Sequence, residues 1–187
     1  MNTRDLVLVS LFAAIIVALG LLPPITLGFI PVPITAQSLG VMLAGTILGA
    51  RRGTLSVALV ILLVIIGLPV LSGGRGGLAV FAGPTVGFLI GWLPAAFVTG
   101  YLSERFAAGR ANGFAQLANL FIAAVAGGVV VLYACGIVGM MLVAGLPFMK
   151  ALSGSLAFVP GDLIKAGVAA LAARAVQAGY PLLPVRS

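Results

Sequence analysis

An acid and a base lie three residues apart in the last long apolar stretch of the chain. Asp162 and Lys165 belong to the segment PGDLIK at 160–165. On a helix, residues at this spacing share a face, so their side chains can act together. A carboxylate accepts hydrogen bonds from ligand N–H groups, and an ammonium donates to a ligand acceptor. Because each charge at membrane depth costs roughly 2.5–3.5 kcal/mol on insertion scales, the pair indicates a function.

Each of these two residues also has a structural interpretation. Pro160 and Gly161 place Asp162 in the first turn of a helix, where a carboxylate caps N–H groups and meets the favourable end of the helix dipole. Lys165 lies one turn deeper, where the dipole disfavours a cation. The partner of Lys165 is therefore either Asp162 or an acceptor on a ligand.

Two further cations are candidates for binding an anionic group. Arg75 lies among four glycines in the segment SGGRGG at 72–77. It is either a solvated charge in a flexible loop or part of a lid whose guanidinium holds a carboxylate bidentately. Lys150, in the last outer segment, either extends to the lipid headgroups or reaches the ligand.

Uncharged side chains complete the candidate set. Gln37 has two donors and an acceptor in an apolar stretch, suited to a ligand or to an interhelical hydrogen bond, and Tyr133 faces the same choice. Thr35 either caps a helix or contributes to the site. Aromatic residues could either line an apolar pocket or anchor helices at the membrane interface. They are Phe81, Phe88, Trp92 and Tyr133.

The composition identifies the surrounding solvent as lipid. Of the 187 residues, 62% are hydrophobic and only 7% are charged, whereas a soluble domain has about 25% charged residues. The charge-free runs are long enough for several spanning helices, each of which needs about 20 apolar residues. The sequence therefore predicts an all-α integral membrane protein in which residues 1–187 form a single transmembrane substrate-binding domain.

Six transmembrane helices are expected, at about 5–22, 35–50, 53–67, 85–105, 113–138 and 161–178. The second and third are short, about 23–24 Å at 1.5 Å per residue. We expect them to form a hairpin whose outer ends stop below the membrane surface. That hairpin leaves a concavity on the outer side, under the loop at 68–83.

The distribution of Lys and Arg predicts the orientation. With the N-terminus inside, the outer side holds Arg75 and Lys150, and the inner side holds seven cations, which predicts that both termini are cytoplasmic. The seven are Arg4, Arg51, Arg52, Arg105, Arg110, Arg174 and Arg186. The longer segments 23–33, 68–83 and 140–159 then lie outside, so we expect the ligand pocket near the outer face.

Several function classes are disfavoured. The chain has no histidine, three acids and one cysteine, which excludes a disulfide within the chain and argues against a metal site. Its cations lie at predicted helix ends without interleaved aromatic residues, which argues against nucleic acid. There is no nucleotide-binding motif. An enzyme is not expected, and any uphill transport would take its energy from a partner or an ion gradient.

A series of motifs, in order along the chain, resembles the BioY family. They are PVPITAQSLGV at 31–41, GARRG at 49–53, GLPV at 67–70, GGRGG at 73–77, GPTVGF at 83–88 and FVPGDLIK at 158–165. The resemblance implies the substrate-binding S component of an energy-coupling factor (ECF) vitamin transporter, here for biotin, in the cytoplasmic membrane of a prokaryote. The implied partners are biotin, membrane lipid, a transmembrane coupling protein and two ATPases. No cofactor is expected in this chain, and ATP is used only by the partner subunits.

The resemblance also implies how biotin binds. The family's Pro-Gly-Asp-x-x-Lys motif, whose Asp and Lys bind biotin, matches Asp162 and Lys165. The ureido ring of biotin offers two N–H donors and one carbonyl acceptor, which complement a carboxylate and an ammonium. Its carboxylate could pair with Arg75 or Lys150.

Ala14 and Ala18 lie four residues apart in the first helix, a spacing that lets another helix approach closely. They match the family's Ala-x-x-x-Ala contact with the coupling protein. The same two residues could instead mediate self-association in a solitary, oligomeric biotin facilitator. The sequence is also compatible with an S component for another vitamin, such as riboflavin or thiamin, and with a structural membrane protein without a ligand.

Overall fold

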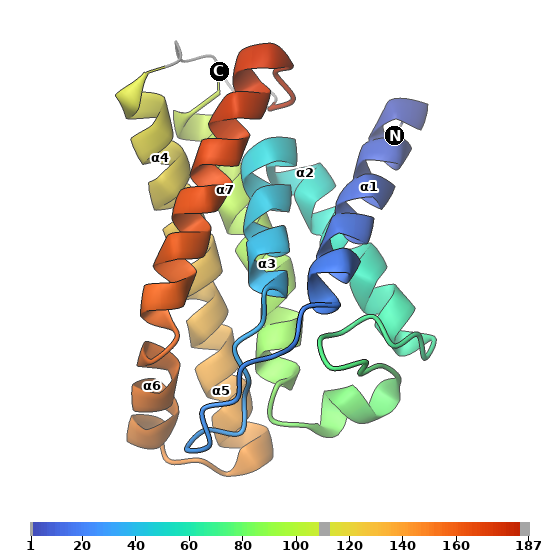
Figure 1. The fold of residues 1–187 in the computed structure, drawn as a ribbon, viewed down its shortest axis with the longest axis vertical. Helices are drawn as coiled ribbons and strands as arrows, with labels where there is room; N and C mark the ends of the chain where they lie inside the picture. Colours follow the sequence, from blue (N-terminus) through green and yellow to red (C-terminus); the bar gives the residue numbers. More distant parts are fainter. Residues whose placement is uncertain (1, 109–112, 184–187) are drawn as a thin grey trace.

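The computed structural model describes residues 2–108 and 113–183, and Arg110 and Arg186 lie outside this range. Within it, every regular element is helical, apart from two isolated β-bridges in loops, Ile25 with Ile34 and Leu71 with Arg75. The predicted all-α class is confirmed. The helices pack side by side in one bundle (Figure 1).

Helix α1 (Thr3–Gly20) begins with a reciprocal cap. The Asp5 backbone N–H donates to the Asn2 side chain at 2.9 Å, and the Asn2 backbone N–H donates to the Asp5 carboxylate at 3.3 Å. Such a box satisfies two N–H groups that a helix start leaves without partners. One face of α1 is buried against α2, while Ala14 and Ala18 lie together on its exposed face.

Helix α2 (Gln37–Ile65) contains a break at Gly49, whose φ of 85° and ψ of −176° are not helical. Gly53 consequently packs against the backbone of Ala44, although nine residues of straight helix would separate them by about 13.5 Å. The element is therefore two short arms folded side by side (Figure 1). The predicted hairpin of helices at 35–50 and 53–67 is confirmed.

A buried acid holds this hairpin. Glu104, only 2% exposed, accepts a hydrogen bond at 2.8 Å from the backbone N–H of Ala50, the first residue after the break. A carboxylate is favourable there because it meets N–H groups and the positive end of the dipole of the second arm. Glu104 belongs to α3 (Val86–Phe106), so the contact ties α2 to α3.

The next span is longer than predicted. Helices α4 (Phe114–Val125) and α5 (Leu132–Ala144) are joined by a π-helical stretch, η2 (Ala126–Val131), and run continuously over 114–144. The span ends at Gly145, whose φ of 63° is the left-handed conformation that commonly ends helices. The sequence predicts an earlier end for this helix, at residue 138.

The segment 140–159 is expected from the sequence to be a loop, and this prediction is wrong. Residues 148–156 form helix α6 (Phe148–Leu156), which is bent by 50° against α7 (Val159–Gly179). Pro147 immediately precedes α6, and Pro160 lies in the first turn of α7, the part of a helix where proline is tolerated. The 68–83 loop likewise contains a short 3₁₀ helix, η1 (Leu78–Ala82).

Within the described residues, four helical stretches are long and apolar enough to cross a membrane, and the bent α6–α7 pair makes five. Dividing α2 at Gly49 gives the six helices that were expected. The start of α1 and the end of α7 lie at one end of the bundle (Figure 1), where Arg4 packs over the ring of Tyr180 at 4.9 Å. At the same end Arg52 pairs with Asp5 at 2.8 Å.

Candidate functional site

A cavity of about 70 Å³ lies where α7 begins, between α2, α3, α5 and the loops before α2 and α3. Its walls are mostly apolar, but four residues with ionisable side chains reach it: Arg75, Tyr133, Asp162 and Lys165. The other lining residues are Val32, Pro33, Ile34, Thr35, Gln37, Ser38, Leu71, Thr85, Phe88, Leu89, Trp92, Leu132 and Phe158.

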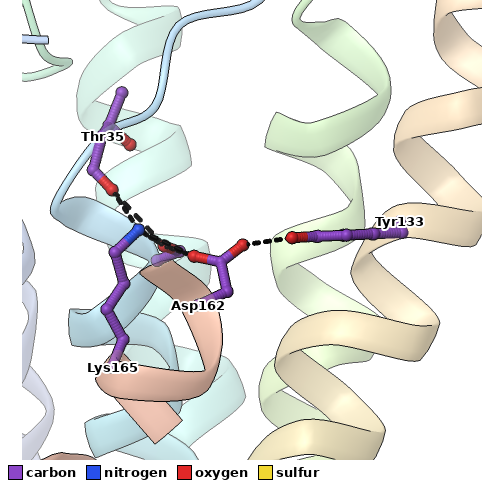
Figure 2. Close-up of polar contacts among 5 residues, drawn as sticks. Thr35, Tyr133, Asp162 and Lys165 are labelled. Carbon is purple, nitrogen blue, oxygen red and sulfur yellow. Dashed lines mark hydrogen bonds and ion pairs between the residues drawn. The ribbon is translucent and has the colours of Figure 1, made fainter. Parts of the chain in front are cut away.

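Asp162 lies at the centre of the polar network, between Lys165 and Tyr133 (Figure 2). The Lys165 ammonium pairs with Asp162 Oδ1 at 2.7 Å, and the Tyr133 hydroxyl donates to Asp162 Oδ2 at 2.6 Å. The Asp162 side chain is only 6% exposed. The two carboxylate oxygens are therefore held in separate directions by residues from two helices.

Lys165 uses its three donors within the protein. Besides Asp162, the ammonium donates to the Thr35 carbonyl at 2.7 Å and to the Ser38 hydroxyl at 2.9 Å. A buried charge is tolerated when it is paired and its hydrogen-bonding capacity is met. The Lys165 side chain is 17% exposed and can reach the cavity, so a ligand acceptor could replace one of these protein partners.

Ser38 was not predicted from the sequence. Its hydroxyl lies 3.4 Å from Asp162 Oδ1 and also accepts from Lys165, so it is a direct neighbour of both charges. The signal available in the sequence was its position one residue after Gln37 in the 31–41 motif. Thr35 was predicted either to cap a helix or to contribute to the site. Its backbone carbonyl accepts from Lys165, and α2 has no side-chain cap.

Aromatic rings form one wall. Phe88, Tyr133 and Phe158 contact one another edge to face, with ring centroids 6.3–6.4 Å apart, the geometry that the ring quadrupoles favour. Trp92 also lines the cavity, whereas Phe81 is not among its lining residues. Of the four aromatic residues proposed from the sequence, three therefore line the cavity and Phe81 does not.

Arg75 is positioned by a tight turn. Gly73 and Gly74 have φ of 79° and 68°, and Leu71 pairs with Arg75 across them. The Arg75 guanidinium donates from Nε to the Ser72 carbonyl at 3.2 Å and from Nη1 to the Thr85 hydroxyl at 3.3 Å. Arg75 makes no ion pair with any described residue, and three of its five N–H donors have no hydrogen-bond partner among those residues.

Gln37 lies at the edge of the cavity with its amide bonded to backbone. Nε2 donates to the carbonyls of Ile16 at 3.2 Å and Val70 at 3.0 Å, and Oε1 accepts from the Ser72 N–H at 2.8 Å. Lys150 is exposed on α6 and is not among the lining residues. Six of the seven candidate ligand residues therefore surround one cavity.

Comparison with known proteins places the chain in a family. The model of the BioY family matches residues 1–182. The chain belongs to the BioY family. The resemblance of the motifs is thereby confirmed over nearly the whole sequence.

The BioY relatives include proteins named biotin transporter BioY. One from Rhizobium etli is 69% identical over 187 residues, covering all of both chains. Another from Rhodobacter capsulatus is 53% identical over 182 residues, 92% of this chain and 93% of its own. Since the family comprises transporters, the expectation that the chain is not an enzyme is confirmed.

A solved structure has the same fold. It is a crystal structure described as the S-component for biotin from an ECF-type ABC transporter, with a TM-score of 0.89 and 33% sequence identity. The match covers 97% of each chain. The cavity described above therefore lies in a fold that this S-component also adopts.

Proposed function

We propose that this chain binds biotin in the cavity around Asp162 and acts in biotin uptake as the S component of an ECF-type transporter. The observation that carries the proposal is the buried Asp162–Lys165 pair facing an apolar, aromatic-walled cavity. The names of the relatives and of the solved structure point to the same ligand.

The polar network matches the ureido ring of biotin. The Asp162 carboxylate accepts from one ureido N–H group, and the Lys165 ammonium donates to the adjacent ureido carbonyl. In exchange, Lys165 gives up one of its bonds to Thr35 or Ser38. The sulfur-containing ring then packs against Phe88 and Phe158, since thioethers make favourable contacts with aromatic rings.

The carboxylate end of biotin requires a cation, and we assign Arg75 to it. Arg75 lines the cavity and has donors to spare, whereas Lys150 is exposed outside the cavity lining. Arg–carboxylate pairs are often bidentate, which suits a guanidinium already fixed by Ser72 and Thr85. Arg75→Ala is expected to weaken biotin binding, whereas Lys150→Ala should leave it unchanged.

The same proposal sets the orientation and partners. The positive-inside rule puts both termini in the cytoplasm and the cavity near the outer face of a prokaryotic cytoplasmic membrane. Ala14 and Ala18, exposed together on α1, would contact a transmembrane coupling protein that works with two ATPases. Cysteines introduced at residue 3 or at residue 74 test the orientation in intact cells. Only the cysteine at 74 should be accessible to labelling from outside.

Calorimetric titration of the purified protein with biotin, against riboflavin and thiamin, tests the ligand. Tight binding of biotin alone is expected, and equal or absent heats would refute the assignment.

Uptake of biotin in cells with and without a coupling module tests the mode of action. Equal uptake in the two strains would favour a solitary facilitator, in which Ala14 and Ala18 mediate self-association.

A further inference from the structure

Gln37 connects three separate parts of the chain. Its buried amide, in a residue 1% exposed, bonds to the carbonyl of Ile16 on α1 and to both the Val70 carbonyl and the Ser72 N–H in the loop after α2. Both amide hydrogens and the amide oxygen are therefore in use. All of these partners are backbone groups of the protein, and the amide has no further N–H.

Ser72 links Gln37 to Arg75, which lines the cavity. Its N–H is held by Gln37, its hydroxyl donates to the Leu22 carbonyl at 3.1 Å, and its carbonyl accepts from Arg75 Nε at 3.2 Å. The residue is 1% exposed. The peptide groups on both sides of Ser72 are thus fixed, and the second of them orients the Arg75 guanidinium.

Arg75 depends on this support because its turn is intrinsically flexible. Four glycines surround it at 73, 74, 76 and 77, and glycine populates many backbone conformations. A bidentate contact requires a guanidinium fixed in position and direction. Two backbone hydrogen bonds between Leu71 and Arg75 close the turn, and the Gln37–Ser72 bond anchors the closed turn to α2.

From these contacts we infer that Gln37 is a positioning residue: it does not bind ligand but fixes the Ser72–Arg75 turn so that Arg75 can hold the carboxylate of the ligand. The inference rests on the proposed function, in which Arg75 pairs with the biotin carboxylate. It assigns Gln37 a role in selectivity for the charged end of the ligand, separate from the Asp162–Lys165 site.

The test compares two ligands that differ only at that end, biotin and biotin methyl ester. Gln37→Leu should lower the affinity for biotin about tenfold, the effect of losing a charge-assisted contact, while changing the affinity for the ester less than about twofold. Arg75→Ala should show the same selective loss.

Gln116→Leu is the matched control. Gln116 is also a buried glutamine, 4% exposed, and it donates to the backbone carbonyl of Ala107, but it does not line the cavity. The control should lower thermal stability without altering the ratio of the two affinities.

A double-mutant cycle removes the remaining ambiguity. In Gln37→Leu/Arg75→Ala, the loss for biotin should equal that of Arg75→Ala alone, because both changes act on one guanidinium. Gln37→Met, which fills similar space, provides a second variant if the leucine protein does not fold. The inference would be overturned if the Gln37 variants lost equal affinity for biotin and for the ester. It would also be overturned if the loss in the double variant were the product of the two single losses. If Arg75→Ala itself fails to discriminate, the inference falls together with the Arg75 assignment, while biotin binding by wild type still supports the proposed function.

Discussion

Two buried carboxylates, at different places in the bundle, are used in different ways. Asp162 is 4% exposed and Glu104 is 2% exposed, so burial alone does not distinguish them. Asp162 lines a cavity and is held by the side chains of Lys165 and Tyr133. Glu104 does not line that cavity, and its Oε1 accepts from the backbone N–H of Ala50 where α2 reverses.

The difference lies in what each partner can do when a ligand arrives. The side chains around Asp162 can rotate and exchange one hydrogen bond for another, so a ligand can enter the network. The Ala50 N–H is fixed by the fold, and losing its acceptor would leave a buried backbone donor at the start of the second arm of α2 without this partner. We therefore expect the Asp162 region to determine affinity and the Glu104 region to determine stability.

The largest effect should come from Asp162→Asn. The amide keeps a carbonyl that can accept from Lys165, but it loses the negative charge and presents an N–H₂ group toward the ligand's own N–H donors. We expect biotin affinity to fall at least about 100-fold, since charge-assisted hydrogen bonds and an unmatched donor are both involved. Calorimetry measures the loss, and a thermal melt without ligand close to that of wild type shows that the fold persists. If Asp162→Asn kept the biotin affinity of wild type, the proposed difference in role between Asp162 and Glu104 would be wrong.

The complementary change is Glu104→Ala. It removes the acceptor of the Ala50 N–H, which should lower stability by about 1–2 kcal/mol, as for other lost helix caps. Glu104→Gln keeps an acceptor oxygen and serves as the matched control, with a smaller loss. Thermal unfolding in detergent and biotin titration are measured together on the three proteins. A loss of affinity in Glu104→Ala larger than its loss of stability accounts for would contradict the division of roles.

The sequence predicted the Asp162–Lys165 pair and the α2 hairpin, but it did not predict the hydrogen bonds that link residues far apart in the chain. The charge pair at 162 and 165 was visible because charge is rare in this chain and the spacing fits one helix face. The hairpin followed from two apolar runs too short to cross a membrane separately. Both are local properties, so they can be read without the tertiary structure.

The missed features depend on contacts between distant residues. Tyr133 reaches Asp162 across 29 positions, and Gln37 bonds to residues 21 and 33–35 positions away, which no spacing rule predicts. Ser38 was missed because a hydroxyl in an apolar helix commonly bonds to its own backbone. Helix α6 was missed because a short amphipathic helix between Gly145 and Pro160 resembles a loop in composition.

A smaller effect is expected from Gly136→Ala on α5. An added Cβ at Gly136 would overlap the ring of Phe88, which lines the cavity, so the ring must move. We expect biotin affinity to fall about tenfold, within the cost of overpacking by one methyl group. The matched control is Gly127→Ala, whose Cβ would overlap the backbone carbonyl of Ala95 and also Thr99, five residues before Glu104 on α3. That control should lower the melting temperature and leave affinity nearly unchanged, and equal losses of affinity in the two variants would show that packing strain spreads between the two regions.

The smallest effect should come from Tyr133→Phe. It deletes one hydroxyl, which donates to Asp162 Oδ2 at 2.6 Å, and keeps the ring that packs against Phe88 and Phe158. If the hydroxyl orients the carboxylate toward the ligand, affinity should fall about three- to tenfold, the range of a single hydrogen bond. Calorimetry of this single variant measures the change, and an affinity equal to or higher than that of wild type would contradict the orienting role of the hydroxyl.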